Sequence, residues 1–373
     1  MFSTMLTRGL RSSWKCRVAP HVPRRSLATV LQSTDAAFRI PIIDFNEFRN
    51  ATTISEKRKT ADQVVNGFKD VGFIYLSGHG IPEPVVNQAF QKSAEFFRLP
   101  SSAKDKLAWE DPRANRGYVQ IGRERVTQSS DADEIAALRA TAPDVKETME
   151  IGRDWDATWK NRWPQEKDVP GFKQTMLDFS QTCHEVHTGV MRSIALGLDL
   201  DEMFFEDKIN EQFHNLRLLS YPPVKTSLLQ REGQSRAGAH SVTAWEDYGT
   251  LTLLFQDSVG GLEVQNPSTK LFQPAQPIPG TIVINAGDLL ARWSNDVLRS
   301  TLHRVVLPPA QKVADTDTEG MTPARQSIAF FCNPNGGAEI SCLPNCYGPE
   351  REKKYAPVTT EEYIVGRLSA TYH

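Results

Sequence analysis

Hydrophobic residues in the first half of the chain mostly follow a helical period. Apolar positions recur at every third or fourth residue over about 55–71, 82–100 and 171–198, and prolines stand at the start of the second segment, where a helix tolerates them. Two short apolar runs, 38–48 and 72–82, have the length and composition of strands. The first half therefore predicts a layer of helices with strands at its edge.

From Asn215 the pattern changes to short apolar runs separated by Gly, Pro and Asn. The runs are LRLLSYPP, LTLLFQD, LEVQN, GTIVINAGDLL, HRVVLPP and RQSIAFFCNPN. Short strands at such close spacing are typical of an antiparallel β-sandwich or barrel. We therefore predict an α+β protein: a double-stranded β-helix, or jelly roll, flanked by an N-terminal helical layer and a C-terminal helix with Thr360 as its N-cap.

These patterns divide the chain into five regions. Residues 101–170 are polar and rich in loops, and we assign them to the N-terminal half. The predicted regions are an N-terminal extension (1–34), an N-terminal helical region (38–170), a helical support (171–210), the jelly-roll core (211–335) and a C-terminal helical tail (336–373).

The N-terminal extension contains six basic residues, interspersed with Ser and Thr, and the chain has no Asp or Glu before Asp35. This is the composition of a transit peptide, and it predicts import into the mitochondrial matrix. The segment RRSLATV, from Arg24 to Val30, is the expected processing region. A basic tail without a targeting role is the alternative interpretation.

The charge balance bears on the kind of partner. The formal net charge is −2, and the chain beyond the extension has 37 basic and 45 acidic residues. This balance argues against a nucleic-acid partner, and no run of about 18 apolar residues suggests a membrane span. We expect a monomer that acts on a small molecule.

Five cysteines are scattered along the chain and are odd in number. They do not suggest a disulfide framework, and they suit a reducing compartment. Cys332, Cys342 and Cys346 lie near one another, which raises the alternative of zinc, but no second close pair or neighbouring histidine accompanies them. Buried thiols are the favoured interpretation.

Two histidines and one carboxylate in the second half could bind a single metal ion. They are His240 and Asp247, early in the predicted jelly roll, and His303, in a later strand. Such a set on one face of an ion, with the remaining positions open, is the facial triad of non-haem Fe(II) oxygenases.

The spacing of the first two members is unusual. A histidine and a carboxylate two positions apart on a strand leave it on the same face, whereas His240 and Asp247 are seven apart. Removing five residues, either Val242–Glu246 or Ser241–Trp245, restores the two-residue spacing. Both alignments select Asp247 rather than Glu246, because Asp247 directly precedes the Tyr-Gly-Thr strand.

Arg325 and Ser327 lie two apart in the segment ARQSIAFF, so they should face the same side of a strand. A guanidinium and a hydroxyl placed together can bind one carboxylate. This pair is a weak indication by itself, and it gains weight because it follows His303 in the chain.

The order of these motifs resembles one known family. The interrupted His-x-Asp, GTLTLLFQD, NAGDLLARWSND, STLHRVV and RQSIAFF follow one another as in the 2-oxoglutarate and Fe(II)-dependent dioxygenases of the isopenicillin N synthase-like superfamily. IPIIDF, GFIYLSGHGI, DVKETMEIGRD and LRLLSYPP are similar to that family too. The resemblance covers roughly residues 38–370 and identifies 38–170 as the N-terminal region of a non-haem dioxygenase.

The resemblance implies the same iron site and adds a co-substrate site. The residues implied are His240, Asp247 and His303 for iron, and Arg325, Ser327 and Tyr221 for 2-oxoglutarate. Leu219 stands where many plant members have an asparagine that also contacts the co-substrate.

The implied cofactors are Fe(II), 2-oxoglutarate as co-substrate and O₂, with ascorbate as a reductant. The implied reaction oxidises, and most simply hydroxylates, a small organic molecule with release of succinate and CO₂. Desaturation and ring modification are alternatives, and no general motif identifies the substrate. Arg123 or Arg125 could receive an anionic substrate, although solvation at the surface is favoured.

The five extra residues leave two interpretations open. A tolerated bulge or loop would still return Asp247 to the metal. Alternatively, the chain is a splice variant or an impaired relative that cannot hold iron and acts at most as a binding protein, since Val codons begin with GT and one Glu codon ends with AG. An iron oxidase that does not use the keto acid is a third, narrower option.

Four other residues have simpler interpretations. His184 and His187 lie three apart in a predicted helix but lack the spacing of zinc proteases, so we interpret them as structural. His79 is expected to bond to backbone in a turn, and Trp293 is expected to pack in the core.

Overall fold

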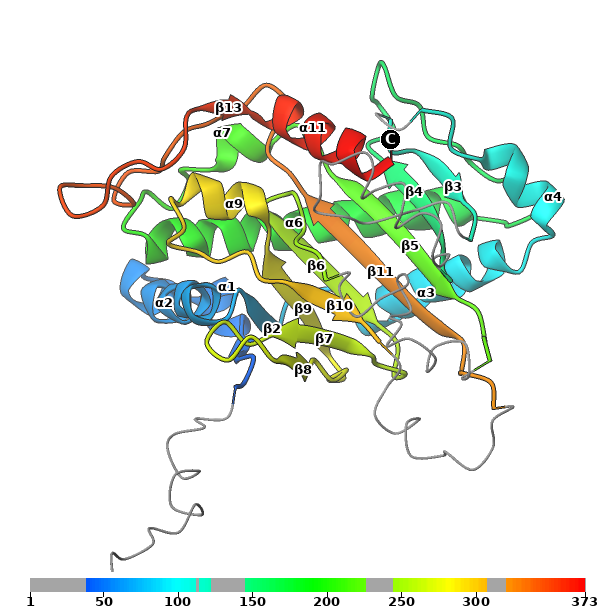
Figure 1. Cartoon of the computed structure of the whole chain (residues 1–373), viewed down its shortest axis with the longest axis horizontal. Coiled ribbons are helices and arrows are strands. Elements are labelled where there is room, and N and C mark those ends of the chain that lie inside the picture. Colours follow the sequence, from blue (N-terminus) through cyan, green and yellow to red (C-terminus); the bar gives the residue numbers. More distant parts are fainter. Residues whose placement is uncertain (1–37, 112–113, 122–144, 226–243, 307–319, 373) are drawn as a thin grey trace, which may run out of the picture. The chain divides into compact units, whose positions relative to one another are not determined.

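The alternating apolar runs of the second half form the two sheets of a jelly roll (Figure 1). The computed structural model describes residues 38–111, 114–121, 145–225, 244–306 and 320–372, with side chains up to residue 367. Within these residues, Arg39 onward forms one compact unit. The α+β jelly-roll prediction is confirmed.

The larger sheet has eight strands among the described residues. In spatial order they are β1 (Ile42–Asp44), β2 (Phe73–Ser77), β9 (Thr281–Ala286), β6 (Leu251–Gln256), β11 (Arg325–Cys332), β5 (Asn215–Tyr221), β4 (Glu147–Gly152) and β3 (Gly117–Val119). β1 and β2 pair in parallel, and the other neighbours are antiparallel. The first half of the chain therefore contributes strands to both edges of this sheet.

Two smaller sheets complete the strands of the described chain. One has the order β10 (His303–Val305), β7 (Leu262–Gln265) and β8 (Phe272–Pro274), and the other pairs β12 (Glu339–Ile340) with β13 (Val358–Thr359). The three-stranded sheet is antiparallel throughout, and β10 begins at His303.

Three long helices pack along one side of the larger sheet (Figure 1): α2 (Ile54–Asp70), α3 (Glu83–Phe97) and α6 (Phe172–Gly197). The other helical elements of the described chain are α1 (Asn46–Asn50), α4 (Ser101–Lys104), the 3₁₀ turn η2 (Asp105–Leu107), α7 (Glu206–Ile209), α9 (Asp288–Trp293) and α11 (Thr360–Tyr372). The three helices predicted from apolar periodicity are confirmed as α2, α3 and α6. α2 begins with a capping box, in which Thr53 and Glu56 exchange side-chain and backbone hydrogen bonds.

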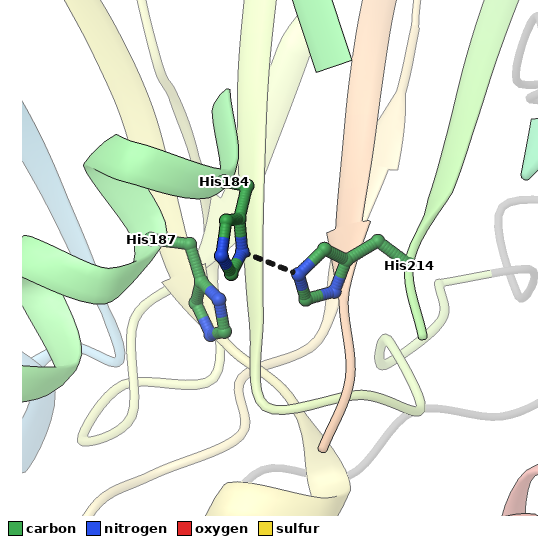
Figure 2. A group of neighbouring side chains, drawn as sticks. All are labelled: His184, His187 and His214. Atoms are coloured by element: carbon green, nitrogen blue, oxygen red, sulfur yellow. Dashed lines mark hydrogen bonds between the residues drawn. The ribbon is translucent and has the colours of Figure 1, made fainter. Parts of the chain in front are cut away.

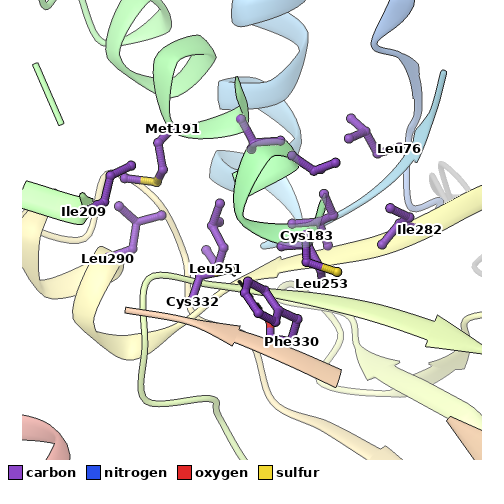
Figure 3. Close-up of a cluster of buried hydrophobic side chains, with 14 of the residues drawn as sticks. Leu76, Cys183, Met191, Ile209, Leu251, Leu253, Ile282, Leu290, Phe330 and Cys332 are labelled. Atoms are coloured by element: carbon purple, nitrogen blue, oxygen red, sulfur yellow. Dashed lines mark hydrogen bonds between the residues drawn. The ribbon is translucent and has the colours of Figure 1, made fainter. Parts of the chain in front are cut away.

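Side chains of the larger sheet alternate between a helix-covered face and a second face that lines a cavity. On β11, Ile328, Phe330 and Cys332 belong to the buried core, whereas Arg325, Ser327, Ala329 and Phe331 line the cavity. Figure 3 shows Cys183 of α6 directed toward Leu253 and Phe330 in that core. The period of two along a strand thus separates packing residues from residues available for chemistry.

The described residues between 101 and 170 include two strands that the sequence does not predict, because β3 and β4 extend the large sheet. Every residue of β4 is buried, including two glutamates. Glu147 accepts hydrogen bonds from Lys104 Nζ and the Tyr118 hydroxyl, both at 2.6 Å. Charged residues that are paired inside the protein do not give an apolar pattern, so this strand was missed.

The N-cap of the C-terminal helix differs from the prediction by one residue. Thr359 Oγ1 accepts from the Glu362 backbone N–H, and the Glu362 carboxylate accepts from the Thr359 N–H. This reciprocal pair is a capping box, so Thr359 is the N-cap and Thr360 is the first helical residue.

None of the described helices is long and apolar enough to cross a membrane.

The contact between α2 and α6 depends on a glycine. A Cβ built on Gly197 would collide with Val65 Cγ2 and would lie 2.8 Å from the carbonyl oxygen of Ala61. We expect Gly197→Ala to lower the free energy of unfolding by about 1–3 kcal/mol, because the backbone of α2 must move. Urea denaturation measures the loss. Gly337→Ala is the control, since nothing lies within 4 Å of its built Cβ, and equal losses in both variants would contradict this explanation.

Candidate active site

A cavity of about 150 Å³ is lined by residues of the larger and the three-stranded sheets. Five of the six predicted site residues line it: Tyr221, Asp247, His303, Arg325 and Ser327. The sixth, His240, lies outside the described residues. The fold therefore brings residues from distant parts of the sequence to one place.

Two hydrogen bonds fix the carboxylate of Asp247 at this cavity. Its Oδ2 accepts from the hydroxyl of Thr252 at 2.6 Å and from Nδ2 of Asn285 at 2.8 Å. The two donors are buried and are register partners on β6 and β9. Because neutral donors orient the carboxylate without cancelling its charge, the charge remains available to a cation.

The imidazole of His303 has a defined proton arrangement. Its Nδ1 lies 3.1 Å from the carbonyl oxygen of Thr301, which can only accept, so Nδ1 carries the proton and donates. In the neutral ring Nε2 then has a lone pair, and Nε2 lies 3.7 Å from Oδ2 of Asp247. A ring fixed through Nδ1 in this way is the usual arrangement of a metal-binding histidine.

These donors fit the iron that the resemblance implies. A distance of 3.7 Å between Asp247 Oδ2 and His303 Nε2 is too long for a hydrogen bond, but it suits two groups that bind one ion. A carboxylate oxygen and an imidazole nitrogen are also the ligand types of non-haem Fe(II) sites. His240 remains the predicted third ligand.

Arg325 is a buried cation on the cavity wall, with 1% of its surface exposed. Its Nε donates to the carbonyl of Gly260 at 2.8 Å, and its Nη1 donates to Ser327 Oγ at 3.2 Å. The guanidinium also lies over the ring of Tyr221, 4.8 Å from the centroid. No carboxylate pairs with Arg325 among the described residues, so an anionic ligand would complete its environment.

A second polar cluster on the cavity wall was not found from the sequence. The buried carboxylate of Glu150 on β4 lies 2.6 Å from Nε of Arg217, and its other oxygen accepts from Nδ2 of Asn215 at 2.6 Å. Arg217 and Asn215 line the cavity, and the Arg217 guanidinium lies 5.2 Å from the ring centroid of Phe331. Alternation along β5 places Asn215 and Arg217 on the cavity face, but their partner on β4 could not be predicted from this alternation.

The C-terminal helix forms part of the cavity wall. Ile364 lines the cavity, and Arg367 pairs with Asp288 at 3.1 Å and lies over the ring of Tyr248 at 4.6 Å. α11 is therefore held at the site by an ion pair as well as by apolar contact.

Glu246, which also lines the cavity, has an unusual acidity. Burial raises the pKa of Glu246 to about 7, and the neighbouring carboxylate of Asp288 adds to this shift.

Three histidines form a separate cluster (Figure 2). His184 and His187 lie on α6, His214 directly precedes β5, and one nitrogen of each lies within 4.8 Å of the others. Burial lowers the pKa of His214 well below its usual value and that of His187 to about 3, so both rings are neutral at physiological pH. Nδ1 of His187 has no hydrogen-bond partner among the described residues. The spacing alone could hold a metal ion.

The hydrogen bonds of this cluster favour a structural role. His214 Nδ1 accepts from the backbone N–H of Asn333 at 3.1 Å, so its proton lies on Nε2, which donates to Nδ1 of His184 at 3.0 Å. A metal ion at His214 Nε2 would have to displace this proton and leave an anionic ring, or break the bond to Asn333. We therefore interpret the cluster as a support for Asn333, which lines the cavity.

The remaining sequence predictions also have structural outcomes. His79 Nδ1 accepts from the backbone N–H of Ile81 at 3.1 Å, and Trp293 is buried against Phe205, which confirms both predictions. The three cysteines weighed as zinc ligands are free thiols, and none belongs to a metal-type cluster within the described chain. Arg123 and Arg125 lie outside the described residues.

Two family models match the chain. Residues 40–166 match the N-terminal region of the non-haem dioxygenases of morphine synthesis, and residues 212–334 match the 2OG-Fe(II) oxygenase superfamily. A similar protein of Metarhizium majus, named 2-oxoglutarate-Fe(II) type oxidoreductase ppzD, is 35% identical over 90% of this chain and 95% of its own length. A proline hydroxylase of Petromyces alliaceus, buaE, is 33% identical over 88% and 98%.

Solved structures give the same result. T7H of Neurospora crassa, determined with alpha-KG (2-oxoglutarate) and thymine, is 44% identical, with a TM-score of 0.80 over 91% of this chain and 99% of that one. An oxygenase of Caulobacter crescentus is 28% identical, with a TM-score of 0.71 over 88% and 98%. Together with the cavity and its donors, these similarities show that the chain belongs to the 2-oxoglutarate and Fe(II)-dependent oxygenases, a family of oxidoreductases.

Proposed function

We propose that the chain hydroxylates a small planar heterocycle of the pyrimidine-base type. The observation that carries this proposal is a cavity wall that combines aromatic rings with fixed polar groups. Phe331 and Tyr248 offer flat surfaces, and Asn215 and Arg217 offer polar atoms whose positions are set by Glu150. A flat ring that carries both C=O and N–H groups suits such a wall.

The solved structures support this substrate class. T7H of Neurospora crassa was determined with alpha-KG and thymine and also with alpha-KG and 5-formyluracil, and it is 44% and 41% identical to this chain in the two comparisons. The proposed reaction is R–H + 2-oxoglutarate + O₂ → R–OH + succinate + CO₂. One oxygen atom enters the product, and the other enters succinate.

The iron would be held by Asp247 and His303, which line the cavity. His240, the third ligand that the resemblance implies, lies outside the described residues. When bound, Fe(II) supplies the redox chemistry that couples oxidative decarboxylation of the keto acid to oxidation of a substrate C–H bond. Thr252 and Asn285 keep the Asp247 carboxylate directed at the cavity.

The far carboxylate of 2-oxoglutarate would bind Arg325 and Ser327. Arg325 already donates through Nε to the carbonyl of Gly260, so its position is set before the acid arrives. Leu262 and Val305 form an apolar part of the same wall. They exclude water, which strengthens the charge-assisted contact and orients the keto acid.

We further propose that ascorbate maintains the iron in its reduced state and that the chain works as a monomer. A reductant is needed because iron oxidised without substrate turnover can no longer support the reaction.

Arg325→Ala tests the co-substrate site. We expect it to raise the 2-oxoglutarate concentration needed for half-maximal turnover by a factor that corresponds to roughly 1.5–3 kcal/mol, because a charge-assisted contact is lost. Iron content should not change, and Arg325→Lys should rescue only partly. Arg153→Ala, which removes an arginine away from the cavity, is the control. An unchanged dependence on the keto acid in Arg325→Ala would place the anchor elsewhere.

Succinate formation tests the substrate class. We expect thymine to stimulate succinate release, with one hydroxylated product per succinate, and we expect uracil, which lacks the methyl group, and free L-proline to stimulate it less. Product without succinate would exclude the role of the keto acid. Failure of every pyrimidine base to bind or to stimulate turnover would overturn the proposed substrate class.

Glu150→Gln tests whether the polar groups of the cavity wall bind the base. It weakens the contact that orients Arg217, so KM for the base should rise by roughly tenfold while KM for 2-oxoglutarate stays the same. Asp156→Asn is the matched control, because Asp156 is also a buried carboxylate paired with an arginine, but its partner Arg153 does not line the cavity as Arg217 does. Equal effects of the two variants on KM would mean that Glu150 contributes only to folding.

We propose that the basic N-terminal extension directs the chain to the mitochondrial matrix. Its support is the absence of acidic residues together with six basic ones in residues 1–34. Residues 1–30 fused to a fluorescent reporter should enter mitochondria, whereas the same segment with its basic residues replaced by glutamine should not. Cytosolic fluorescence from the unaltered fusion would contradict import.

A further inference from the structure

Trp245 lies where its side chain can reach the metal site. It stands two positions before Asp247, and its backbone pairs with His303 as an antiparallel bridge. The N–H of Trp245 donates to the carbonyl of His303 at 3.0 Å, and the N–H of His303 donates to the carbonyl of Trp245 at 3.1 Å. Residues that exchange both hydrogen bonds are directly opposite, and their side chains leave the pair on the same side.

The side-chain contacts agree with this register. The rings of Trp245 and His303 pack edge to face, with centroids 5.1 Å apart. Trp245, Asp247 and His303 line the same cavity. Oδ2 of Asp247 lies 3.7 Å from Nε2 of His303. The indole thus lies beside the two donors that fit iron.

In a His-x-Asp motif the residue two before the aspartate is the histidine ligand. Trp245 has this place relative to Asp247, because the five extra residues move His240 to seven positions away. An indole has one N–H donor and offers no lone pair to a cation as imidazole does. The described part of the site therefore presents two protein ligands, Asp247 and His303. The third side chain beside them, Trp245, cannot bind the ion as a histidine would.

We infer that the indole of Trp245 occupies the corner beside Asp247 and His303 that a third ligand would take, so that Trp245 limits how tightly the chain holds iron. This inference rests on the iron of the family and not on the proposed pyrimidine substrate. Metal binding measured without a substrate therefore tests it independently of the substrate class.

The experiment measures Mn²⁺ binding to the full chain, as a stand-in for Fe²⁺ that does not react with O₂, by calorimetry in the presence of 2-oxoglutarate. Trp245→His should raise the affinity by roughly tenfold or more, since even residues that only orient a ligand change affinity by about 10–100-fold. The gain should persist when His240→Ala is added. Trp245→Phe is the matched control and should leave the affinity unchanged.

His240→Ala alone decides between the two ligand sets. If the inference is right, this variant binds Mn²⁺ as the unaltered chain does. A loss of about tenfold or more, or no gain in Trp245→His, would overturn the inference and make Trp245 a wall residue only. Should Trp245→His fail to fold, deletion of Val242–Glu246 replaces it, with the same expected gain, which His240→Ala should then abolish.

Discussion

The approach of Asp247 Oδ2 to His303 Nε2, 3.7 Å apart, is the constraint on which the function of this protein depends. The two residues do not hold each other in place, since Asp247 bonds to Thr252 and Asn285 and His303 bonds to the carbonyl of Thr301. Thr252 and Asn285 are register partners in the larger sheet, and Thr301 stands two residues before β10. Both donors are therefore in position before any ion arrives, which reduces the ordering that metal binding must pay for.

Burying charge around this site opposes folding, and the structure offsets that in two ways. Glu150 neutralises Arg217 within the protein, at 2.6 Å, and so fixes a guanidinium on the cavity wall. Arg325 instead bonds to a carbonyl and a hydroxyl and has no carboxylate partner among the described residues. An uncompensated buried cation is unfavourable until an anion binds. Arg217 is thus already paired within the protein, whereas the charge of Arg325 is fully compensated only when an anionic ligand binds.

The sequence predicted those features that follow from the periodicity of apolar residues, namely the faces of strands and the extent of helices. The alternation in RQSIAFF separated Arg325 and Ser327 from Ile328 and Phe330, and apolar spacing located α6 within a residue at each end. It missed β4, because its glutamates are buried by pairing with residues on other strands and helices. The Glu150 cluster and the His214 bond to Asn333 were missed for the same reason, since both join residues that only the fold brings together.

The five extra residues affect the sheet and the metal site differently. They precede β6, whose register with β9 and β11 begins only at Leu251, so the pairing of the core does not depend on their number. The metal site depends on parity. Were 240–247 one extended strand, His240 and Asp247 would leave it on opposite faces, because they are an odd number of positions apart, whereas Trp245 and Asp247 share a face. A change in the length of the segment before β6 can therefore alter which residues bind the ion while the fold stays intact. The fold depends on the pairing of β6 with β9 and β11, and the metal site depends on the positions of the residues before β6.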